Sequence, residues 1–180
     1  DGVITGAEAL VRWEKPGEGL VSPGKFIPIF EKNGLISVLD RYVWGEVCRL
    51  QRKRLDQELE VVPVSINVSR VEFYNPNLCE DIRNIVRKYD LPTDLIKIEI
   101  TESAYADDPT LVQEAVKKLH EYGFVVLMDD FGSGYSSLNT LKDLPIDVLK
   151  IDMKFMDSFD QNQKAAVILE AIIRMAKWMK

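Results

Sequence analysis

Short apolar runs rich in β-branched residues alternate along this chain with longer amphipathic stretches. This alternation is typical of repeated strand and helix units around a mainly parallel sheet. The runs predicted as strands are residues 3–13, 61–68, 95–100, 124–128 and 148–151. We therefore expect an α/β fold.

The amphipathic stretch at residues 37–50 has apolar positions at helical spacing. Ser37 and Asp40 are spaced as a capping box, which predicts the start of this helix. The stripe expected to be buried comprises Val38, Leu39, Tyr42, Val43, Val47 and Leu50.

A second helix is predicted over residues 109–122. Asp108 is a candidate N-cap, Pro109 suits the first turn, and Gly123 is a stop signal. Its predicted buried stripe comprises Leu111, Val112, Ala115, Val116 and Leu119. A last helix is expected over residues 163–180.

The residues at both ends of the chain predict that it is a segment of a longer fold. Asp1-Gly2 is a favoured hairpin-turn dipeptide directly before a strand, and no strand follows the last helix. A closed eight-stranded α/β barrel takes about 250 residues. The five strands predicted in 180 residues therefore indicate an incomplete barrel.

Composition narrows the classes of function. A formal net charge of -6 argues against binding of duplex nucleic acid through a broad basic face. Cys48 and Cys79 lack metal-finger spacing, which fits a reducing cytoplasm. No apolar run approaches the roughly 20 residues of a membrane span. We expect a soluble, cytoplasmic segment without membrane contact, which is compatible with a membrane anchor elsewhere in a parent protein.

The predicted strands end in polar residues, at the edge where barrels of this kind hold their active sites. These residues are Glu8, Asn67, Glu99, Asp129, Asp130, Lys150 and Asp152. Carboxylates gathered in one cleft would repel one another, so hard divalent cations are their natural partners. Magnesium or manganese fits this set, because zinc more often recruits Cys or His and His120 is the only histidine.

Each of these residues also has a purely structural interpretation. Glu8 could be an exposed strand residue, Asn67 could cap a turn, and Asp129-Asp130 could open an ordinary turn. Lys150 and Arg12 could be surface groups. Their joint occurrence at strand ends favours a functional site, whereas His120, in a predicted helix, is expected to be structural or exposed.

These residues carry a resemblance to the EAL-domain family over nearly the whole chain. The matching motifs are Glu8-Ala9-Leu10-Val11-Arg12, Ser22-Pro23 with Phe26-Ile27-Pro28, Asn67-Val68-Ser69, Glu99-Ile100-Thr101-Glu102-Ser103, Asp129-Asp130-Phe131-Gly132-Ser133-Gly134-Tyr135-Ser136-Ser137-Leu138, and Leu144-Pro145-Ile146-Asp147-Val148-Leu149-Lys150-Ile151-Asp152. Ser133 stands where the family usually has Thr. The resemblance implies a TIM-like (β/α)8 barrel, of which residues 1–180 are one partial domain without the antiparallel first strand and the last two strands.

The resemblance implies hydrolysis of cyclic di-GMP to linear pGpG with two Mg²⁺ or Mn²⁺ ions, which activate a water and stabilise the leaving oxygen. It implies the following roles: Glu8, Asn67, Glu99 and Asp129 as metal ligands, Asp130 at the second ion, Lys150 orienting the attacking water, and Glu102 steadying the loop after Asp130. Leu10 and Arg12 would contact the substrate, Arg12 through a phosphate, and Asp152 is a further candidate there.

Other features of the family lie outside the chain. A later metal-ligating Glu and a Gln would follow Lys180, and a Gln-Pro-Ile stretch that helps bind guanine would precede the first hairpin. The resemblance also implies a homodimer and an attached sensor or diguanylate cyclase domain. Two rival functions stay open: a receptor that binds cyclic di-GMP without hydrolysing it, and a structural or dimerising module whose carboxylates only cap strands.

Overall fold

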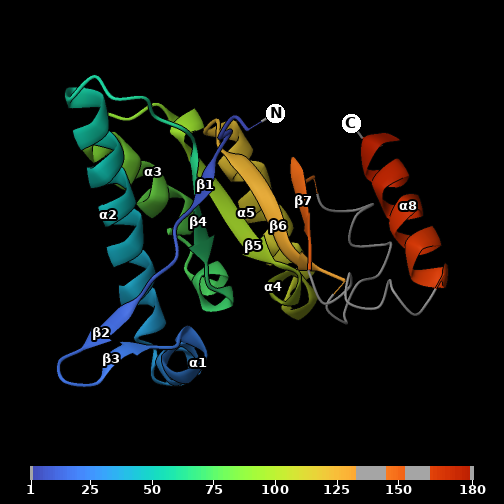
Figure 1. Ribbon diagram of the computed structural model, residues 1–180, viewed down its shortest axis with the longest axis horizontal. Coiled ribbons are helices and arrows are strands. Elements are labelled where there is room, and N and C mark those ends of the chain that lie inside the picture. Colours follow the sequence, from blue (N-terminus) through green and yellow to red (C-terminus); the bar gives the residue numbers. More distant parts are fainter. Residues whose placement is uncertain (1, 133–144, 153–162, 179–180) are drawn as a thin grey trace.

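The computed structural model describes residues 2–132, 145–152 and 163–178. Within them, one sheet of five strands has the order β1-β4-β5-β6-β7, and every neighbouring pair is parallel. The strands are β1 (Ala7–Glu8), β4 (Val64–Val68), β5 (Ile96–Thr101), β6 (Val125–Phe131) and β7 (Val148–Ile151). Figure 1 shows this sheet with helices packed along it, which confirms the α/β prediction.

The first predicted strand is wrong in extent. Of residues 3–13, only Ala7–Glu8 pair with β4, and the chain then enters a separate antiparallel hairpin of β2 (Trp13–Lys15) and β3 (Gly19–Val21). The ring of Trp13 packs edge-on against Phe26, with 5.6 Å between the ring centroids. This contact with the following helix draws the chain away from the sheet after β1.

The helices are α1 (Pro23–Asn33), α2 (Ile36–Asp56), α3 (Leu78–Lys88), α4 (Glu102–Asp107), α5 (Pro109–Glu121) and α8 (Gln163–Trp178), with short 3₁₀ helices η1 (Arg70–Tyr74) and η2 (Thr93–Leu95). The signals predicted for α5 are confirmed. The Asp108 carboxylate accepts the N–H of Leu111, and the chain leaves the helix through Gly123 at φ +86°. The predicted Val112, Val116 and Leu119 are buried.

The prediction for α2 is wrong in two respects. The helix begins at Ile36, so Ser37 and Asp40 lie inside it, and no side chain caps its first turn. Its buried face comprises Ile36, Asp40, Trp44, Val47, Cys48 and Gln51, whereas Val38, Tyr42 and Leu50 of the predicted stripe are exposed. Burial of the large Trp44 side chain against the sheet turns the helix to this face.

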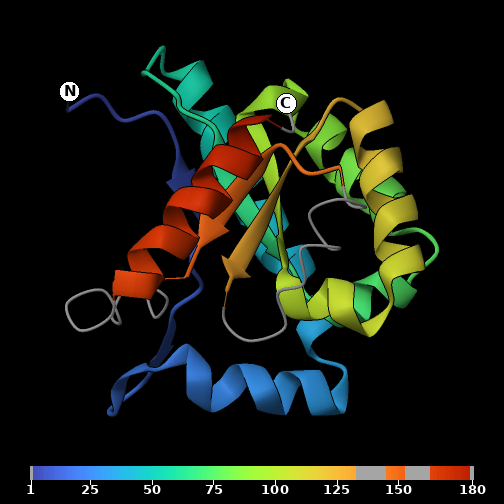
Figure 2. The ribbon, with the colours of Figure 1, turned by 90° about the vertical axis from the view of Figure 1, so that its right-hand side faces the viewer.

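The core lies between the sheet and its helices. The central strands contribute side chains with no exposed surface, namely Ile66, Ile96, Ile98, Ile100, Val126 and Met128. Helix α2 contacts β4, α5 contacts β6, and α3 contacts both helices. Figure 2 shows α1 beyond the end toward which the strands point, so the segments that follow the strands face α1 and the hairpin.

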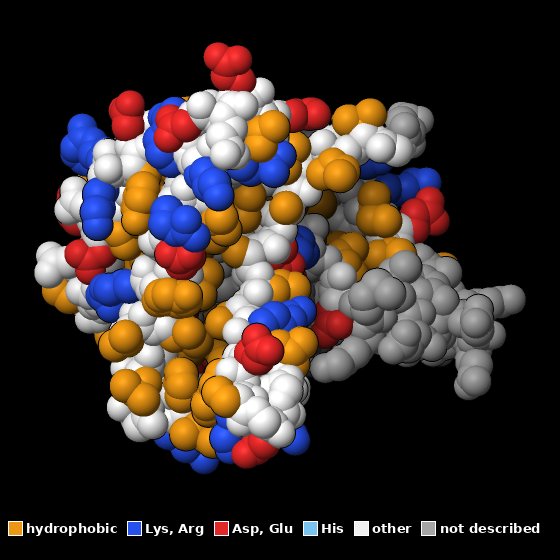
Figure 3. All heavy atoms as spheres, turned by 60° about the vertical axis from the view of Figure 1, so that its left-hand side comes forward, with side chains coloured by type: hydrophobic (Ala, Val, Ile, Leu, Met, Phe, Trp, Pro, Cys, Tyr) orange, Lys and Arg blue, Asp and Glu red, His pale blue; other side chains and the backbone are white. Residues whose placement is uncertain are grey.

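One face of the molecule mixes charges of both signs. On the face drawn in Figure 3, basic and acidic side chains are interspersed with hydrophobic ones, and the described residues there form no broad basic patch. Of the helices that the structure describes, none combines the length and apolar content needed to cross a bilayer.

Candidate active site

Five strands bring polar side chains from distant parts of the sequence to one edge of the sheet. Glu8 ends β1, and the parallel register sets Asn67 of β4 opposite Glu99 of β5. In β6, Asp129 lies opposite Thr101. Lys150 of β7 completes the group, although it is 142 positions from Glu8.

Three carboxylates form the centre of this site. Glu8, Glu99 and Asp129 each present an oxygen within 4.8 Å of the others. The Lys150 ammonium lies 3.0 Å from Glu8 Oε2, 3.0 Å from Glu99 Oε1 and 3.3 Å from Asp129 Oδ1. The Asn67 amide donates to Glu8 Oε1 at 3.2 Å. The structure thus brings together five of the residues singled out in the sequence.

The electrostatics of the group depend on Lys150. Burial raises the pKa of Glu99, and the charge of Glu8 raises it further. Burial acts in the same direction on Glu8, but hydrogen bonds from Lys150 and Asn67 outweigh it and lower the pKa of Glu8. Burial would lower the pKa of Lys150, but its hydrogen bonds to Glu99 and Glu8 raise it, so the ammonium stays charged.

The donor set fits a hard divalent cation. Glu99 is 1% exposed, and its Oε2 has no hydrogen-bond partner among the residues that the structure describes. A buried carboxylate oxygen without a donor is costly, and an ion commonly accounts for one. The acidic group contains two Glu and one Asp, with an Asn amide beside it, which is the oxygen-rich chemistry that Mg²⁺ and Mn²⁺ prefer.

Asp130 and Glu102 lie beside the acidic group. Asp130 adopts φ +58° within a bulge between Met128 and Phe131, and it is not one of the three clustered carboxylates. Glu102 is buried, and its Oε2 accepts the N–H of Gly132 at 3.2 Å. It therefore fastens the backbone just after β6. The rest of that predicted motif, from Ser133 onward, lies outside the described residues.

A cavity of about 610 Å³ adjoins the site between the strand ends, α1 and α2. Its wall includes Leu10, Arg12, Ile27, Asp40, Asn67, Ser69, Arg70, Ser103 and Asp130. This volume is in the usual range of small-molecule sites. Asp152 is not part of the described wall; it follows β7, and its main-chain N–H donates to the Phe131 carbonyl.

Comparison with protein families decides the assignment, because the EAL domain family matches residues 1–180. The chain belongs to the EAL-domain family. This EAL domain is 36% identical over 177 residues to the bifunctional diguanylate cyclase/cyclic di-GMP phosphodiesterase MucR of Pseudomonas aeruginosa, covering 98% of the chain and 26% of that protein. It is 38% identical to the signaling protein YkoW of Bacillus subtilis, covering 96% of the chain and 21% of YkoW.

Solved structures give the same fold. The P. aeruginosa MucR phosphodiesterase in complex with cyclic di-GMP matches with a TM-score of 0.89 and 36% identity, over 98% of this chain and 71% of that one. The FimX EAL domain of P. aeruginosa matches with a TM-score of 0.85 at 20% identity, over 96% and 68% of the two chains. The predicted fold, part of a TIM-like barrel of the EAL type, is confirmed.

Two residues near the site of this EAL domain were not predicted from the sequence to lie there. Asp40 was assigned to a helix cap, yet its carboxylate accepts the main-chain N–H of Ser69 at 2.9 Å and borders the cavity. Arg70 brings a second cation to the cavity wall beside Arg12. One feature of the sequence could have indicated this position. Asp40 lies four residues before Trp44, and in a helix this spacing places the Asp40 carboxylate on the same face as the buried tryptophan.

Replacing Asp40 with asparagine is expected to stabilise the fold above pH 6. Burial raises the pKa of Asp40 from 3.8 to about 6, although its bond with Ser69 opposes this. Between these two values the folded state keeps a proton that the unfolded state has lost, so the stability of the wild type falls as pH rises through this window. A shift of about 2 units corresponds to at most about 3 kcal/mol. Asparagine retains an acceptor for Ser69 without the buried charge.

Urea unfolding of both proteins between pH 4 and pH 8 measures the effect. The advantage of Asp40→Asn should be near zero at pH 4 and reach roughly 2 kcal/mol above pH 6. An advantage that does not change with pH would show that Asp40 is not the buried titrating group.

Proposed function

We propose that this EAL domain hydrolyses cyclic di-GMP to linear pGpG with two Mg²⁺ or Mn²⁺ ions. The observation that carries the proposal is the meeting of Glu8, Glu99 and Asp129 within 4.8 Å of one another, beside a cavity that can hold a small ligand. The names of the MucR relative and of its structure with cyclic di-GMP support the choice of substrate. So does the probable cyclic di-GMP phosphodiesterase PdeG of Escherichia coli, at 34% identity over 98% of the chain and 35% of PdeG.

The proposed metal ligands are Glu8, Asn67, Glu99 and Asp129, with Asp130 beside the second ion. When bound, the ions would lower the pKa of a water and neutralise charge on the phosphate. Lys150 has its ammonium 3.0 Å from both Glu8 and Glu99, where it can donate to an oxygen at the centre of the site and so orient the attacking water. Glu102 would keep Asp130 in place through the N–H of Gly132.

The cavity supplies the proposed contacts to the substrate. Cyclic di-GMP carries two phosphate charges, and Arg12 lies on the cavity wall as their cationic partner. The exposed side chain of Leu10 offers an apolar surface to the ligand. Asp152, which directly follows β7, is proposed to act from the edge of the site rather than from the cavity wall.

The proposal extends to partners and location. This chain spans 26%, 21% and 35% of the lengths of MucR, YkoW and PdeG, so we propose a parent protein with an attached sensor or diguanylate cyclase domain. We also propose a homodimer. Cys48 and Cys79 are free buried thiols, which fits a cytoplasmic location.

Hydrolysis of cyclic di-GMP is expected to require a divalent cation. The assay follows pGpG formation by the natural-length protein with saturating Mn²⁺, with saturating Mg²⁺ and with excess chelator. We expect turnover with either ion, none with chelator, and recovery when Mn²⁺ is restored. The same assay on residues 1–180 alone would test whether this segment suffices.

Other outcomes would favour the rival functions. Tight binding of cyclic di-GMP without pGpG formation would show that this domain acts as a receptor and not as an enzyme. No binding of nucleotide, together with a melting temperature that Mn²⁺ does not change, would leave a structural module, since a ligand bound only by the folded state must raise stability.

A further inference from the structure

The backbone of Asn67 lies just beyond the point where β4 stops pairing with β1. On this edge, the N–H of Ala7 donates to the Pro63 carbonyl and the N–H of Ala9 donates to the Ser65 carbonyl, each at 2.9 Å. In the described part of the chain, the second of these is the last main-chain bond between the two segments. The carbonyl of Asn67, two residues further along, therefore extends past the end of β1.

Helix α2 supplies the missing partner. The indole N–H of Trp44 donates to the Asn67 carbonyl at 3.0 Å, and Trp44 has no exposed surface. One helical turn earlier, Asp40 accepts the N–H of Ser69 at 2.9 Å. The two side chains thus bond the Asn67 carbonyl at the end of β4 and the Ser69 N–H just after it, which would otherwise lack a partner on this edge.

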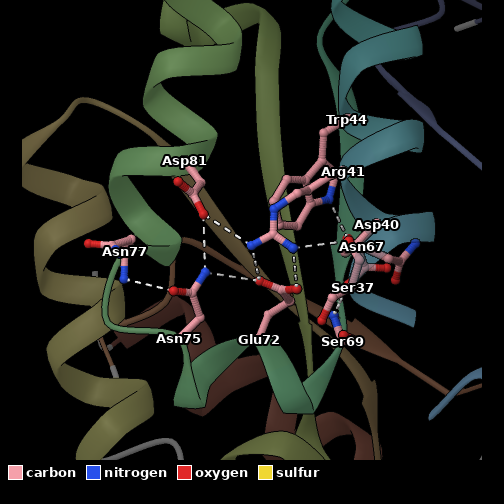
Figure 4. A network of polar contacts seen from close by, with 10 residues as sticks. All are labelled: Ser37, Asp40, Arg41, Trp44, Asn67, Ser69, Glu72, Asn75, Asn77 and Asp81. Atoms are coloured by element: carbon pink, nitrogen blue, oxygen red, sulfur yellow. Dashed lines mark hydrogen bonds and ion pairs between the residues drawn. The ribbon is translucent and has the colours of Figure 1, made fainter. Parts of the chain in front are cut away.

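The same helix holds the segment that follows. Figure 4 shows the Arg41 guanidinium between the carboxylates of Glu72 and Asp81, with N–O distances of 3.1 Å to each. Asn75 also donates to Asp81 at 3.1 Å. Glu72 is buried, so this network ties η1 to α2 through Arg41 and to α3 through Asp81.

Fixing the backbone of Asn67 also fixes its side chain. The side-chain amide of Asn67 donates to Glu8 Oε1 at 3.2 Å, while the main-chain carbonyl of Asn67 accepts the indole N–H of Trp44. Metal ligands must lie within about 0.2 Å of their required distances, so a small backbone shift at Asn67 would weaken binding.

We propose that Trp44 and Asp40 are positioning residues that hold Asn67 for metal binding. The inference rests on the proposed function, because Asn67 must be a metal ligand for its position to matter. Partners that orient a metal ligand typically contribute 10- to 100-fold to metal affinity. The effect of Trp44 and Asp40 should therefore appear in metal affinity before it appears in substrate binding.

The test measures Mn²⁺ affinity from the rise in melting temperature with Mn²⁺ concentration, in the natural-length protein. Trp44→Phe removes the indole N–H and keeps an aromatic ring. We expect Mn²⁺ to bind about tenfold more weakly. The KM for cyclic di-GMP at saturating Mn²⁺ should change less than twofold, as estimated for a residue that does not touch the substrate.

Gln51→Met is the matched control. Gln51 is another buried donor of α2, and its amide donates to the Val62 carbonyl at 2.8 Å, before β4 begins and at the opposite end of that strand from Asn67. This variant leaves the carbonyls of Val62 and Leu95 without their Gln51 donor and should lower the melting temperature. Its Mn²⁺ affinity should stay within about twofold of the wild type, because no metal ligand is displaced.

A second pair tests Asp40. Asp40→Asn keeps an acceptor for the Ser69 N–H and should retain most of the Mn²⁺ affinity, whereas Asp40→Leu should lose about as much as Trp44→Phe. Unchanged Mn²⁺ affinity in Trp44→Phe, or an equal loss in Gln51→Met, would overturn the positioning role. If the wild type shows no Mn²⁺ effect at all, the proposed function fails and the inference falls with it.

Discussion

Glu99→Gln is expected to abolish most of the turnover without unfolding the domain. Glutamine has nearly the same shape as glutamate but removes the charge from the most buried member of the acidic group, which is 1% exposed. If Glu99, as a metal ligand, accounts for roughly 4 kcal/mol of the charge stabilisation that the metal gives the transition state, kcat should fall about a thousandfold. Melting in chelator and pGpG formation in Mn²⁺ are the two measurements.

The same Glu99→Gln substitution that lowers kcat should not lower the stability of the metal-free domain. Burial raises the pKa of Glu99, and repulsion from Glu8 adds to this, so the ionised carboxylate destabilises the fold at neutral pH when no metal is bound. Its Oε2 also lacks a hydrogen-bond partner among the described residues. The glutamine variant should therefore melt at the same temperature as the wild type in chelator, or higher, as expected for a residue retained for function.

Glu46→Gln is the control for this experiment. Glu46 pairs with Arg49 on the exposed side of α2, remote from the acidic group. It should leave both kcat and the melting temperature near those of the wild type. Retention of more than about a tenth of kcat in Glu99→Gln would mean that Glu99 is not a metal ligand.

The sequence predicted the site better than it predicted the helix that supports it. Polar residues at the ends of parallel strands must meet at one edge, so the amino-acid sequence alone was enough to group Glu8, Asn67, Glu99, Asp129 and Lys150. The structure places all five within this group. What each residue contributes to turnover stays a prediction.

The buried face of α2 was predicted only in part, since Val47 of the predicted stripe is buried but Val38, Tyr42 and Leu50 are exposed. The difference has a physical reason. Apolar side chains of α2 point in most directions around the helix axis. Val38, Tyr42 and Leu50 therefore have helical spacing, and so does the different face that contains Trp44. The sheet selects the second, because the large indole packs there and its N–H finds the Asn67 carbonyl. A tertiary hydrogen bond of this kind leaves no periodic signal in the sequence.

The extents of the first strand and of β6 were wrong for a related reason, whereas β7 lies at the predicted residues. Residues 3–13 are apolar enough for one long strand, but the contact of Trp13 with Phe26 directs the chain into a hairpin after β1. At β6 the predicted strand ended at Met128, whereas a bulge with Asp130 at φ +58° carries it to Phe131. Positive φ at a residue other than glycine is rarely signalled by sequence, and such residues often lie at functional sites.

Lys150→Met is expected to change metal affinity and activity in opposite directions. In the wild type the ammonium lies within 3.3 Å of oxygens from all three carboxylates, so it competes with any cation for the same group. Methionine keeps much of the side-chain volume and removes the charge. Mn²⁺ should then bind more tightly, while kcat falls because no ammonium orients the attacking water.

Without metal, the same variant should be less stable. Removing one partner of a buried ion pair typically costs 3 to 5 kcal/mol, but Lys150 is 31% exposed, so we expect roughly 2 kcal/mol, or a fall of about 6 °C in melting temperature. Mn²⁺ should recover this loss, because a divalent cation neutralises the carboxylates in place of the ammonium. The rise on adding Mn²⁺ should therefore exceed that of the wild type.

Lys118→Met separates this effect from the general loss of a lysine. Lys118 pairs with Glu80 at 3.6 Å on the surface of α5, outside the acidic group. Its removal should change stability by less than about 0.5 kcal/mol and leave the Mn²⁺ response unchanged. If Lys150→Met instead responds to Mn²⁺ less than the wild type does, Lys150 supports the bound metal rather than competing with it. The geometry of the three carboxylates around its ammonium would then persist in the active enzyme.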